Sequence, residues 1–394
     1  MNAPTEDFVL NAAQRAEVIT GLNQILPAHA VLHEVEDTKP YECDGLAAYR
    51  KMPLAVALPE NEDQVVRILK ACHRLQIPIV PRGAGTGLSG GAMPIEQGLV
   101  LSLAKLKKIV KIDPFTRTAV VQPGVRNLAI SEAVAKHGLY YAPDPSSQIA
   151  CSIGGNVNEN SGGVHCLKYG LTLHNVLRVR TVLMNGDIVE FGGMAPDAPG
   201  LDLLAVLIGS EGMLGIVTEI TVKLVPKPKL ARVIMASFDD IEKGGNAVAA
   251  IIAAGIIPAG LEMMDRATTR AVEDFVHAGY DLDAEAILLC ESDGTPEEVE
   301  EEIARMNAVL EYQGASRIQV SQSEAERLRF WSGRKNAFPA AGRIAADYYC
   351  MDGTIPRRHI ATLLRRIKGM EEKYRLGCLN VFHAGDGNMH PLIL

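Results

Sequence analysis

The sequence predicts an α+β protein built from two successive domains. Its 394 residues are enough for two or three hydrophobic cores. Short β-rich runs separated by glycine-rich loops fill the first part, whereas strand-like runs alternate with amphipathic helices in the second. Because a long β-rich run ends at Pro226 and Pro228, we place the boundary between the two parts there.

The elements of the first part follow from local patterns. Apolar residues at helical spacing, such as Val65, Ile68 and Cys72, predict a helix over residues 60–75. The pair Asn185-Gly186 predicts a hairpin with a type I′ turn, because both residues tolerate positive φ. In order, we expect a helical segment over 1–40, the helix 60–75, strands over 77–80, 98–103 and 118–124, a helix over 127–137, the hairpin 179–192 and a long strand from residue 215.

The second part is expected to be an α+β cap with an antiparallel sheet. Its strand-like runs and helical runs alternate, and a charged helix over residues 297–310 follows the third strand. In order, we expect strands over 231–238, 260–265 and 286–294. A helix that begins at Asp240 follows the first strand, a helix that ends at His277 follows the second, and the helix 297–310 follows the third. The chain is then expected to be helical from Ser321 to about Ala341, with one more helix before the C-terminal stretch.

Composition excludes several classes of protein. A net charge of −8 does not suit a nucleic-acid-binding surface or a polybasic membrane anchor. The seven cysteines are scattered and never spaced C-x-x-C, which excludes an iron–sulfur run and fits a reducing compartment. The most apolar run, Ala247–Gly260, is too short to span a bilayer, and the first 30 residues carry no export signal. We therefore expect a cytoplasmic location.

The glycine loop "PRGAGTGLSGGA" contains a literal G-x-G-x-x-G from Gly85 to Gly90 after a predicted strand. A dinucleotide-binding Rossmann fold would need a helix next, but "GAMPIEQGLVLSL" has no helical periodicity, so this interpretation is rejected. Five of the nine residues from Gly83 to Gly91 are glycine. Such a loop can expose backbone N–H groups that surround phosphates, although a tight surface loop is the simpler alternative.

Two further segments are rich in small residues. They are "PDPSSQIACSIGGNVNENSGG" over residues 143–163 and "GSEGMLGIVTEI" over residues 209–220. One small phosphate would not need three such segments far apart in the sequence. A long ligand lying across several loops would, and FAD is such a ligand.

Together these segments resemble the FAD-binding domain of the vanillyl-alcohol oxidase type, also called the PCMH type. Within that family they are most similar to the D-2-hydroxy acid dehydrogenases, and specifically to the FAD-linked D-subunit family of bacterial glycolate oxidases. The motifs are "YECDGLAAYR", "PRGAGTGLSGG", "LIGSEGMLGIVTEITVKL", "FWSGRKNAFPA" and "FHAGDGNMHPLIL". The resemblance implies a PCMH-type FAD-binding domain over 41–228 and a substrate or cap domain over 229–394.

The resemblance also implies which residues contact FAD. Thr86 stands where relatives with a covalent flavin carry histidine, and threonine lacks the nucleophilic nitrogen, so non-covalent FAD is expected. The loop expected to hold the pyrophosphate contributes Arg82, Gly83, Gly85, Thr86 and Gly87; the flavin and ribityl side is expected to be lined by Asp144, Ser147, Cys151, Gly154, Gly155 and Gly162, with Ile216 also in contact.

The last residues place two histidines around a turn. If the chain turns at Asp386-Gly387, His383 and His390 become directly opposite, with Cβ atoms about 5 Å apart. That distance suits one zinc, iron or manganese ion, although a histidine pair that only caps a hairpin is the alternative. Similar dehydrogenases carry a further S-G-E-H-G-I-G segment that is absent here. We therefore expect a chain truncated to about the first four-fifths of its family's length, with an impaired metal site.

The implied reaction is oxidation of a small 2-hydroxy acid, glycolate or D-lactate, by hydride transfer to the flavin. Arg334 stands where the family carries the arginine that binds the substrate carboxylate; a surface arginine is the alternative. Relatives that bind dicarboxylates have a lysine near the position of Cys350, so a substrate with one carboxylate is expected.

Because the chain lacks a cysteine cluster for electron relay, a partner is implied. In the family the partners are an iron–sulfur subunit and a second flavin-domain-like subunit, which would bring the protein to the inner face of the cell membrane. Two other functions stay open: a zinc hydrolase that uses the histidine pair, and a non-catalytic flavin-binding or scaffolding subunit.

Overall fold

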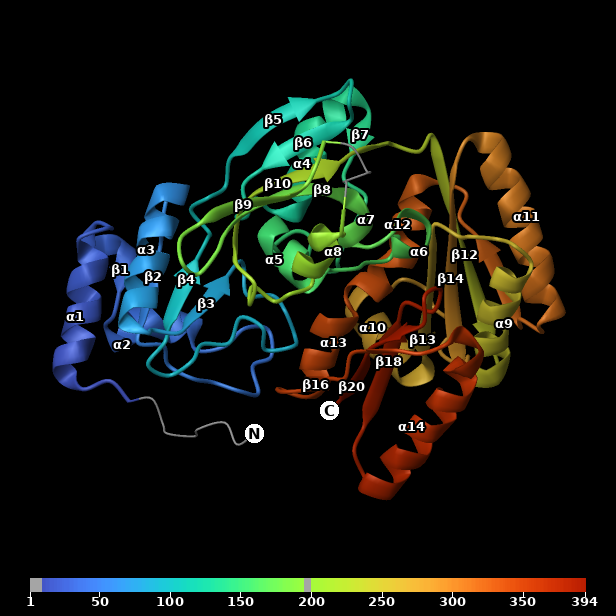
Figure 1. Cartoon of the computed structure of the whole chain (residues 1–394). Coiled ribbons are helices and arrows are strands. Elements are labelled where there is room, and N and C mark those ends of the chain that lie inside the picture. Colours follow the sequence, from blue (N-terminus) through green and yellow to red (C-terminus); the bar gives the residue numbers. More distant parts are fainter. Residues whose placement is uncertain (1–8, 195–199) are drawn as a thin grey trace. The chain divides into compact units, whose positions relative to one another are not determined.

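A computed structural model describes residues 9–194 and 200–394 of the chain, shown in Figure 1. The chain divides into two compact units. Unit 1 comprises residues up to Ser161 together with Leu171–Pro226, and unit 2 comprises Gly162–Gly170 together with Lys227–Leu394. Within the described residues, no helix combines the length and the apolar character that a bilayer crossing requires.

The first sheet of unit 1 has four strands in the order β1-β2-β4-β3. Strands β2, β4 and β3 are parallel, and β1 pairs with β2 in the antiparallel direction. The predicted helix over 60–75 is present as α3, which begins after Asn61, whose side chain accepts from the N–H of Gln64. The bounds are β1 Val31–Leu32, β2 Ala55–Ala57, β3 Ile79–Arg82, β4 Leu99–Ser102, α1 Ala12–Asn23, α2 Val35–Thr38 and α3 Glu62–Leu75.

The second sheet of unit 1 has five antiparallel strands in the order β5-β6-β10-β8-β9. Its buried side chains form a core with those of α4 and α5. The bounds are β5 Ile109–Asp113, β6 Thr118–Val121, β8 Val176–Val182, β9 Ile188–Gly192, β10 Ile216–Lys223, α4 Asn127–Val134, α5 Ile153–Glu159, α7 Thr172–Asn175 and α8 Leu203–Leu207, with a small sheet of β7 Leu139–Tyr140 and β11 Val225–Pro226.

The predicted hairpin over 179–192 is present, but its predicted type I′ turn is wrong. Of Asn185 and Gly186, only Gly186 has a positive φ, of 86°. The N–H of Leu183 donates to the carbonyl of Asp187, so three residues, 184–186, form the loop. The Asn185 side chain accepts from the N–H of Asp187 at 3.0 Å, a local bond that favours this longer turn.

Unit 2 is built on a seven-stranded sheet in the order β15-β12-β14-β13-β18-β20-β16, whose strand pairs are antiparallel. The predicted α+β cap is therefore present. Its bounds are β12 Leu230–Phe238, β13 Gly260–Asp265, β14 Ala286–Gly294, β15 Arg317–Val320, β16 Tyr349–Cys350, β18 Cys378–Phe382, β20 Pro391–Ile393, and a two-stranded sheet of β17 Gly353–Thr354 and β19 Asn388–Met389.

The helices of unit 2 begin at the polar residues that the sequence offers. The α11 N-terminus has a capping box in which Thr295 and Glu298 bond to each other's backbone N–H, followed by Pro296 in the first turn. The bounds are α6 Cys166–Tyr169, α9 Ile241–Ala253, α10 Arg266–Val276, α11 Pro296–Tyr312, α12 Glu324–Lys335, α13 Ala337–Ile344 and α14 Ile360–Tyr374.

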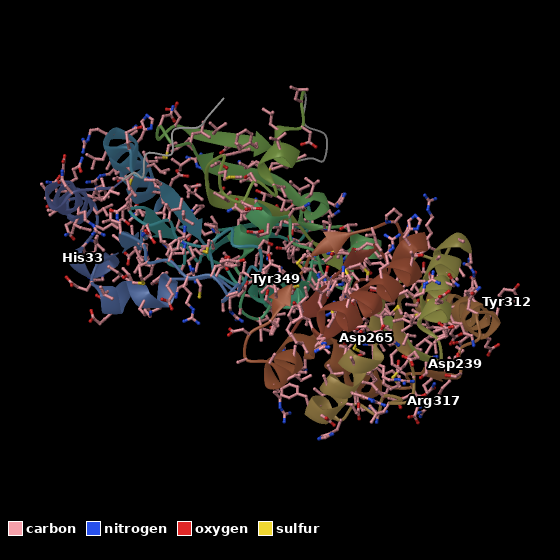
Figure 2. All side chains as sticks on the ribbon, turned by 90° about the horizontal axis from the view of Figure 1, so that it is seen from below. His33, Asp239, Asp265, Tyr312, Arg317 and Tyr349 are labelled. Atoms are coloured by element: carbon pink, nitrogen blue, oxygen red, sulfur yellow. The ribbon has the colours of Figure 1, made fainter. Side chains whose placement is uncertain are left out.

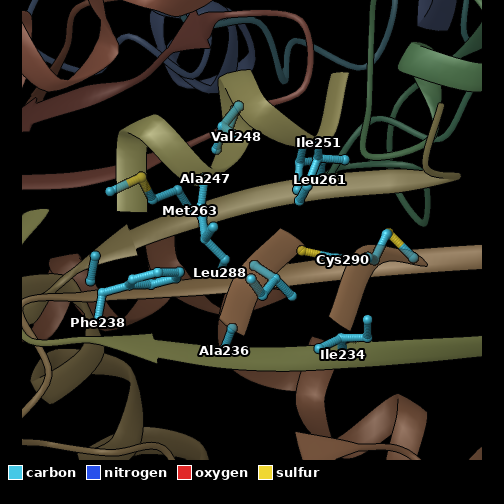
Figure 3. Close-up of a cluster of buried hydrophobic side chains, with 14 of the residues drawn as sticks. Ile234, Ala236, Phe238, Ala247, Val248, Ile251, Leu261, Met263, Leu288 and Cys290 are labelled. Carbon is cyan, nitrogen blue, oxygen red and sulfur yellow. The ribbon is translucent and has the colours of Figure 1, made fainter. Parts of the chain in front are cut away.

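One face of the unit 2 sheet forms the main apolar core. Leu261 and Met263 of β13 and Leu288 of β14 pack there against apolar residues of α9, α11 and α14 (Figure 3). Because side chains alternate along a strand, Gly260 and Glu262 lie on the other face. The strand β13 ends at the buried Asp265, labelled in Figure 2, which accepts from the Asn380 side chain of β18 at 2.7 Å.

Candidate functional site

The three small-residue segments of the sequence converge in unit 1. A Cβ atom added to Gly83 would lie 2.2 Å from the Ser152 hydroxyl oxygen, so the first loop packs directly on the second segment. A Cβ added to Gly91 would lie 2.7 Å from a carboxylate oxygen of Glu159 and 3.4 Å from one of Glu211. Residues 83–91, 143–161 and 209–216 therefore meet around one locus, as the extended-ligand hypothesis requires.

The side chain of Arg82, the last residue of β3, contacts the glycine loop and holds it in place. The side chain is buried, and Nη1 donates to the carbonyls of Cys43 at 2.6 Å and of Ala92 at 3.4 Å. The guanidinium lies 5.5 Å from the ring centroid of Tyr41. A Cβ on Gly85, whose φ is 71°, would lie 2.4 Å from Arg82 Nη2, so only glycine allows this close approach.

The segment after Tyr41 is part of the same locus. A Cβ on Gly45 would lie 2.7 Å from the carbonyl oxygen of Gly87, so this chain also packs on the glycine loop. The side chain of Asp44 is buried there and accepts from the N–H of Leu46 at 2.9 Å. We did not assign Asp44 or Gly45 from the sequence, although both lie in a motif that carries the family resemblance.

The glycines of the second segment have different surroundings. Gly154 and Gly155 lie in the first turn of α5, whose N-cap Ser152 accepts from the N–H of Gly155 at 3.4 Å. A Cβ on Gly154 would lie 2.5 Å from Pro123, so packing alone explains this glycine. A Cβ on Gly155 would meet only the Ser152 hydroxyl, at an ordinary 3.4 Å.

The remaining predicted FAD residues are placed as follows. Thr86 and Gly87 lie in the glycine loop, and Asp144 and Ser147 lie before α5. Cys151 is buried beside Asn156, and burial raises the pKa of its thiol. Gly162 is the first residue of the short segment that belongs to unit 2, and the buried Ile216 is the first residue of β10. The contact of each residue with FAD stays a prediction.

Glu159, the last residue of α5, is an unforeseen carboxyl group at this locus. Burial, together with the nearby charges of Glu211 and Asp44, raises its pKa to about 7. Nothing in the local sequence distinguishes Glu159, because its environment is created by residues 52 and more positions away.

In unit 2 the predicted site residues His383 and Arg334 both contact Glu262, which was not predicted. Met263 pairs with Phe382 and Met264 with Val381, so Glu262 faces His383 across β13 and β18. Glu262 is buried, and its Oε1 lies 2.7 Å from His383 Nδ1. Its Oε2 accepts from Arg334 Nε at 2.5 Å. Burial favours the neutral acid, but the charges of His383 and Arg334 outweigh it and lower the pKa of Glu262.

Arg334 is buried near the end of α12, so the alternative of a surface arginine is wrong. Its Nη2 lies 3.5 Å from His383 Nδ1. A guanidinium cannot accept a hydrogen bond, whereas an ionised carboxylate accepts only. The shorter contact to Glu262 therefore places a proton on Nδ1 of His383.

The predicted register of the two histidines is wrong, although they do meet. The N–H of His383 donates to the carbonyl of Asn388, and Asn380 pairs with Pro391, so His383 is opposite Asn388 and diagonal to His390. A two-residue turn would need positive φ at Asp386 as well as at Gly387, and only Gly387 has it.

The histidine rings nevertheless lie 5.0 Å apart between centroids, at 86° to each other. His390 Nδ1 lies 3.3 Å from the Asp352 carboxylate, as His383 Nδ1 lies beside Glu262. Burial lowers the pKa of His390, and the adjacent His383 adds to the effect. Among the described residues, no group of three or more His, Cys, Asp or Glu side chains has an arrangement that could hold a metal ion.

Comparison with known families and proteins agrees with these features. Residues 53–192 match the family "FAD binding domain", and residues 227–394 match "FAD linked oxidases, C-terminal domain". The chain is 60% identical over 388 residues to "Glycolate oxidase subunit GlcD" of Escherichia coli K12, covering 98% of this chain and 78% of that protein. It is 44% identical to the Bacillus subtilis protein of the same name, covering 89% and 75%.

More distant relatives extend the comparison. A "D-lactate dehydrogenase" of Anaerostipes hadrus is 32% identical, covering 95% of this chain and 80% of that protein. Among solved structures, p-cresol methylhydroxylase with substrate bound matches with a TM-score of 0.83 at 20% identity, covering 98% of this chain and 83% of that one. At this identity the likeness shows the fold alone, and it confirms the predicted α+β fold with a PCMH-type FAD-binding domain.

Proposed function

Because the chain belongs to the family of FAD-linked oxidases that contains the glycolate oxidase subunit GlcD, we propose that it oxidises glycolate or D-lactate to the 2-oxo acid. When bound, FAD would supply the acceptor for the hydride that leaves Cα of the substrate. The convergence of three glycine-rich segments in unit 1 supports FAD binding there. The proposed division assigns FAD to residues 41–228 and the substrate to residues 229–394.

The observation that carries the substrate assignment is the contact of the buried Arg334 and Glu262 with the half-buried His383. Glu262 accepts a hydrogen bond from the Nε–H of Arg334. The two Nη groups then form a planar fork that can bind the substrate carboxylate. Because α12 holds this guanidinium in a buried place, little side-chain entropy is lost when the carboxylate binds.

The histidine pair fits a metal ion in the chemistry of its donors. With both Nδ1 atoms beside carboxylates, His383 and His390 can each offer Nε2 as a ligand, which is the usual carboxylate–histidine–metal arrangement. Zinc, iron or manganese bound there would supply Lewis acidity toward the substrate hydroxyl. Two histidines form an incomplete set of protein ligands, because catalytic sites commonly have three.

The electron acceptor is proposed to be a partner protein. The seven cysteines are scattered along the sequence and never spaced C-x-x-C, so the chain offers no iron–sulfur motif for an electron relay of its own. The family points to an iron–sulfur subunit and a second flavin-domain-like subunit as partners. Through them the protein would act on the cytoplasmic side, at the inner face of the cell membrane.

An absorption spectrum before and after adding substrate tests this function. We expect a flavin band at about 450 nm that bleaches with glycolate or D-lactate, and turnover when a dye acceptor is present. A colourless protein that takes up no added FAD would overturn the assignment. A stable flavin band that neither substrate bleaches would favour a non-catalytic flavin-binding subunit instead.

A further inference from the structure

We propose that Glu262 is a positioning residue that fixes the tautomer of His383 and the orientation of Arg334 at the same time. This inference rests on the proposed function, because it concerns the groups that we assign to the substrate carboxylate and hydroxyl. Nothing in the local sequence "GLEMMD" distinguishes this glutamate from a surface residue of a strand.

Both carboxylate oxygens of Glu262 are committed, each to one partner. Oε1 lies 2.7 Å from His383 Nδ1 and Oε2 lies 2.5 Å from Arg334 Nε. An ionised carboxylate accepts hydrogen bonds and donates none, so it requires a proton on both nitrogens. A neutral His383 then carries its proton on Nδ1 and its lone pair on Nε2, the atom that is free to bind a metal ion or to accept the substrate hydroxyl proton.

Glu262 also fixes a distance. Its two oxygens belong to one rigid group held on β13, and the side chain is 1% exposed. Arg334 comes from α12, and His383 directly follows β18. The carboxylate therefore holds the carboxylate-binding group and the hydroxyl-binding group at one separation, which favours a 2-hydroxy acid over acids with the hydroxyl elsewhere.

A second buried glutamate on the same sheet face provides the contrast. Glu291 of β14 faces Gly260 across the strand pair. Its carboxylate accepts hydrogen bonds from Arg327 at 2.8 Å and from the Trp331 indole, and it lies 3.0 Å from His165 Nε2. This group has the same chemical composition, a carboxylate between an arginine of α12 and a histidine. Glu291 contacts neither Arg334 nor the histidine pair. A Glu291 variant therefore shows how far the loss of a buried carboxylate bonded to α12 affects the protein when the proposed site itself is unchanged.

Glu262→Gln removes one of the two acceptors without changing the size of the side chain. The amide has one oxygen and one NH2 group, so it can satisfy only one of the two N–H donors. Either His383 moves its proton to Nε2 to accept from the amide, or Arg334 faces an N–H donor and turns away. Glu262→Asp is one methylene shorter and cannot reach both partners.

The experiment observes the His383 ring nitrogens directly. In protein labelled with 15N-histidine, two-bond proton–nitrogen spectra above the ordinary titration range of histidine distinguish the two tautomers. We expect Nδ1–H for His383 in the unaltered protein and in Glu291→Gln. In Glu262→Gln we expect either loss of that state or, if the amide oxygen faces His383 and Arg334 turns away, a retained Nδ1–H together with a raised KM. His383→Ala identifies the signal, and thermal unfolding shows whether each variant is folded.

The kinetic arm uses glycolate with a dye acceptor. We expect Glu262→Gln to lower kcat/KM by about 10- to 100-fold, with a rise in KM, whereas Glu291→Gln retains the KM of the unaltered protein. If the spectrum of the unaltered protein shows that His383 carries its proton on Nε2, the proposal is overturned, whether or not the variants fold. So does an unchanged His383 signal with an unchanged KM in Glu262→Gln. If no 2-hydroxy acid reduces the flavin, the proposed function fails, and the His383 signal still tests the role of Glu262.

Discussion

Arg327 and Arg334 lie seven residues apart on α12, and each donates to a buried carboxylate on the same face of the unit 2 sheet, Arg327 to Glu291 and Arg334 to Glu262. Seven residues are about two helical turns, so the two side chains leave the helix in the same direction. Ion pairs of this kind rarely add net stability over apolar packing, because both charges must be desolvated. The Arg334–Glu262 pair differs from the Arg327–Glu291 pair because its histidine, His383, also contacts a second histidine, His390. A functional role therefore explains the Arg334–Glu262 pair better than a contribution to stability does.

Arg334→Lys should lower kcat/KM for glycolate more than it lowers stability. Lysine keeps the charge but loses the planar fork, so one hydrogen bond to the substrate carboxylate is lost, at about 2 kcal/mol. That loss corresponds to about a 30-fold decrease. Arg327→Lys is the control, because Arg327 also donates to a buried glutamate from the same helix although its side chain is more exposed, and it should retain the KM of the unaltered protein. Equal kinetic effects in both variants would contradict the substrate role of Arg334.

Chelation tests the histidine pair. If His383 and His390 hold a metal ion, dialysis against a chelator should lower turnover, and zinc, iron or manganese should restore it while the flavin spectrum stays the same. His390→Ala should bind less metal, as measured by atomic emission. Full activity in protein from which metal analysis finds none would leave the pair with a structural role.

Local sequence patterns predict most helices and strands of this fold, but they predict the turn types less well. The two predicted two-residue turns, at Asn185-Gly186 and Asp386-Gly387, failed in the same way. In each, only the glycine has a positive φ, and the preceding Asn or Asp side chain accepts from a backbone N–H two residues on. That local bond competes with the type I′ conformation and lengthens the loop.

The site could be predicted where it depends on sequence motifs and could not where it depends on register. The three glycine-rich segments were expected to meet, and they do. Glu262 is 121 residues from His383. It faces that residue only because β13 pairs with β18 in one register, and a shift by one position would turn it into the apolar core. No local signal reports such a partner.

Denaturation tests the non-covalent attachment of FAD. Thr86 offers a hydroxyl in place of a ring nitrogen, so no flavin bond should form at this position. We expect acid precipitation to release the yellow colour into the supernatant, where its spectrum is that of free FAD. A yellow pellet that keeps its absorbance after washing would show a covalent bond.

Two glycine substitutions should separate packing from cofactor contact. Gly83→Ala places a Cβ 2.2 Å from the Ser152 hydroxyl, so it should cost about 1–3 kcal/mol of unfolding free energy. A Cβ on Gly87 has no atom closer than 4.0 Å. Gly87→Ala should therefore be stable, yet bind FAD more weakly if the pyrophosphate approaches this backbone. Fluorescence titration with FAD measures the affinity, and unchanged affinity in Gly87→Ala would move the pyrophosphate elsewhere.

The carboxyl group of Glu159 predicts how stability depends on pH. Its pKa is about 7 in the folded protein, against an ordinary 4.5, mainly because of burial. The folded state therefore binds more protons than the unfolded state between these values, so this group lowers stability as the pH rises from about 4.5 to above 7. Glu159→Gln cannot ionise and should escape this loss.

We expect Glu159→Gln to have a higher Tm than the unaltered protein at pH 8 and a similar Tm at pH 4.5, as measured by thermal unfolding across this range. Asp113→Asn is the control, because Asp113 is a half-buried carboxylate whose pKa is lowered by the hydrogen bond from the N–H of Thr116. Its loss should therefore act in the opposite direction. At pH above the ordinary aspartate range, Asp113→Asn should lower the Tm slightly. If Glu159→Gln instead lowers the Tm at pH 8, burial and the nearby charges of Glu211 and Asp44 do not raise the pKa of Glu159 in the folded protein.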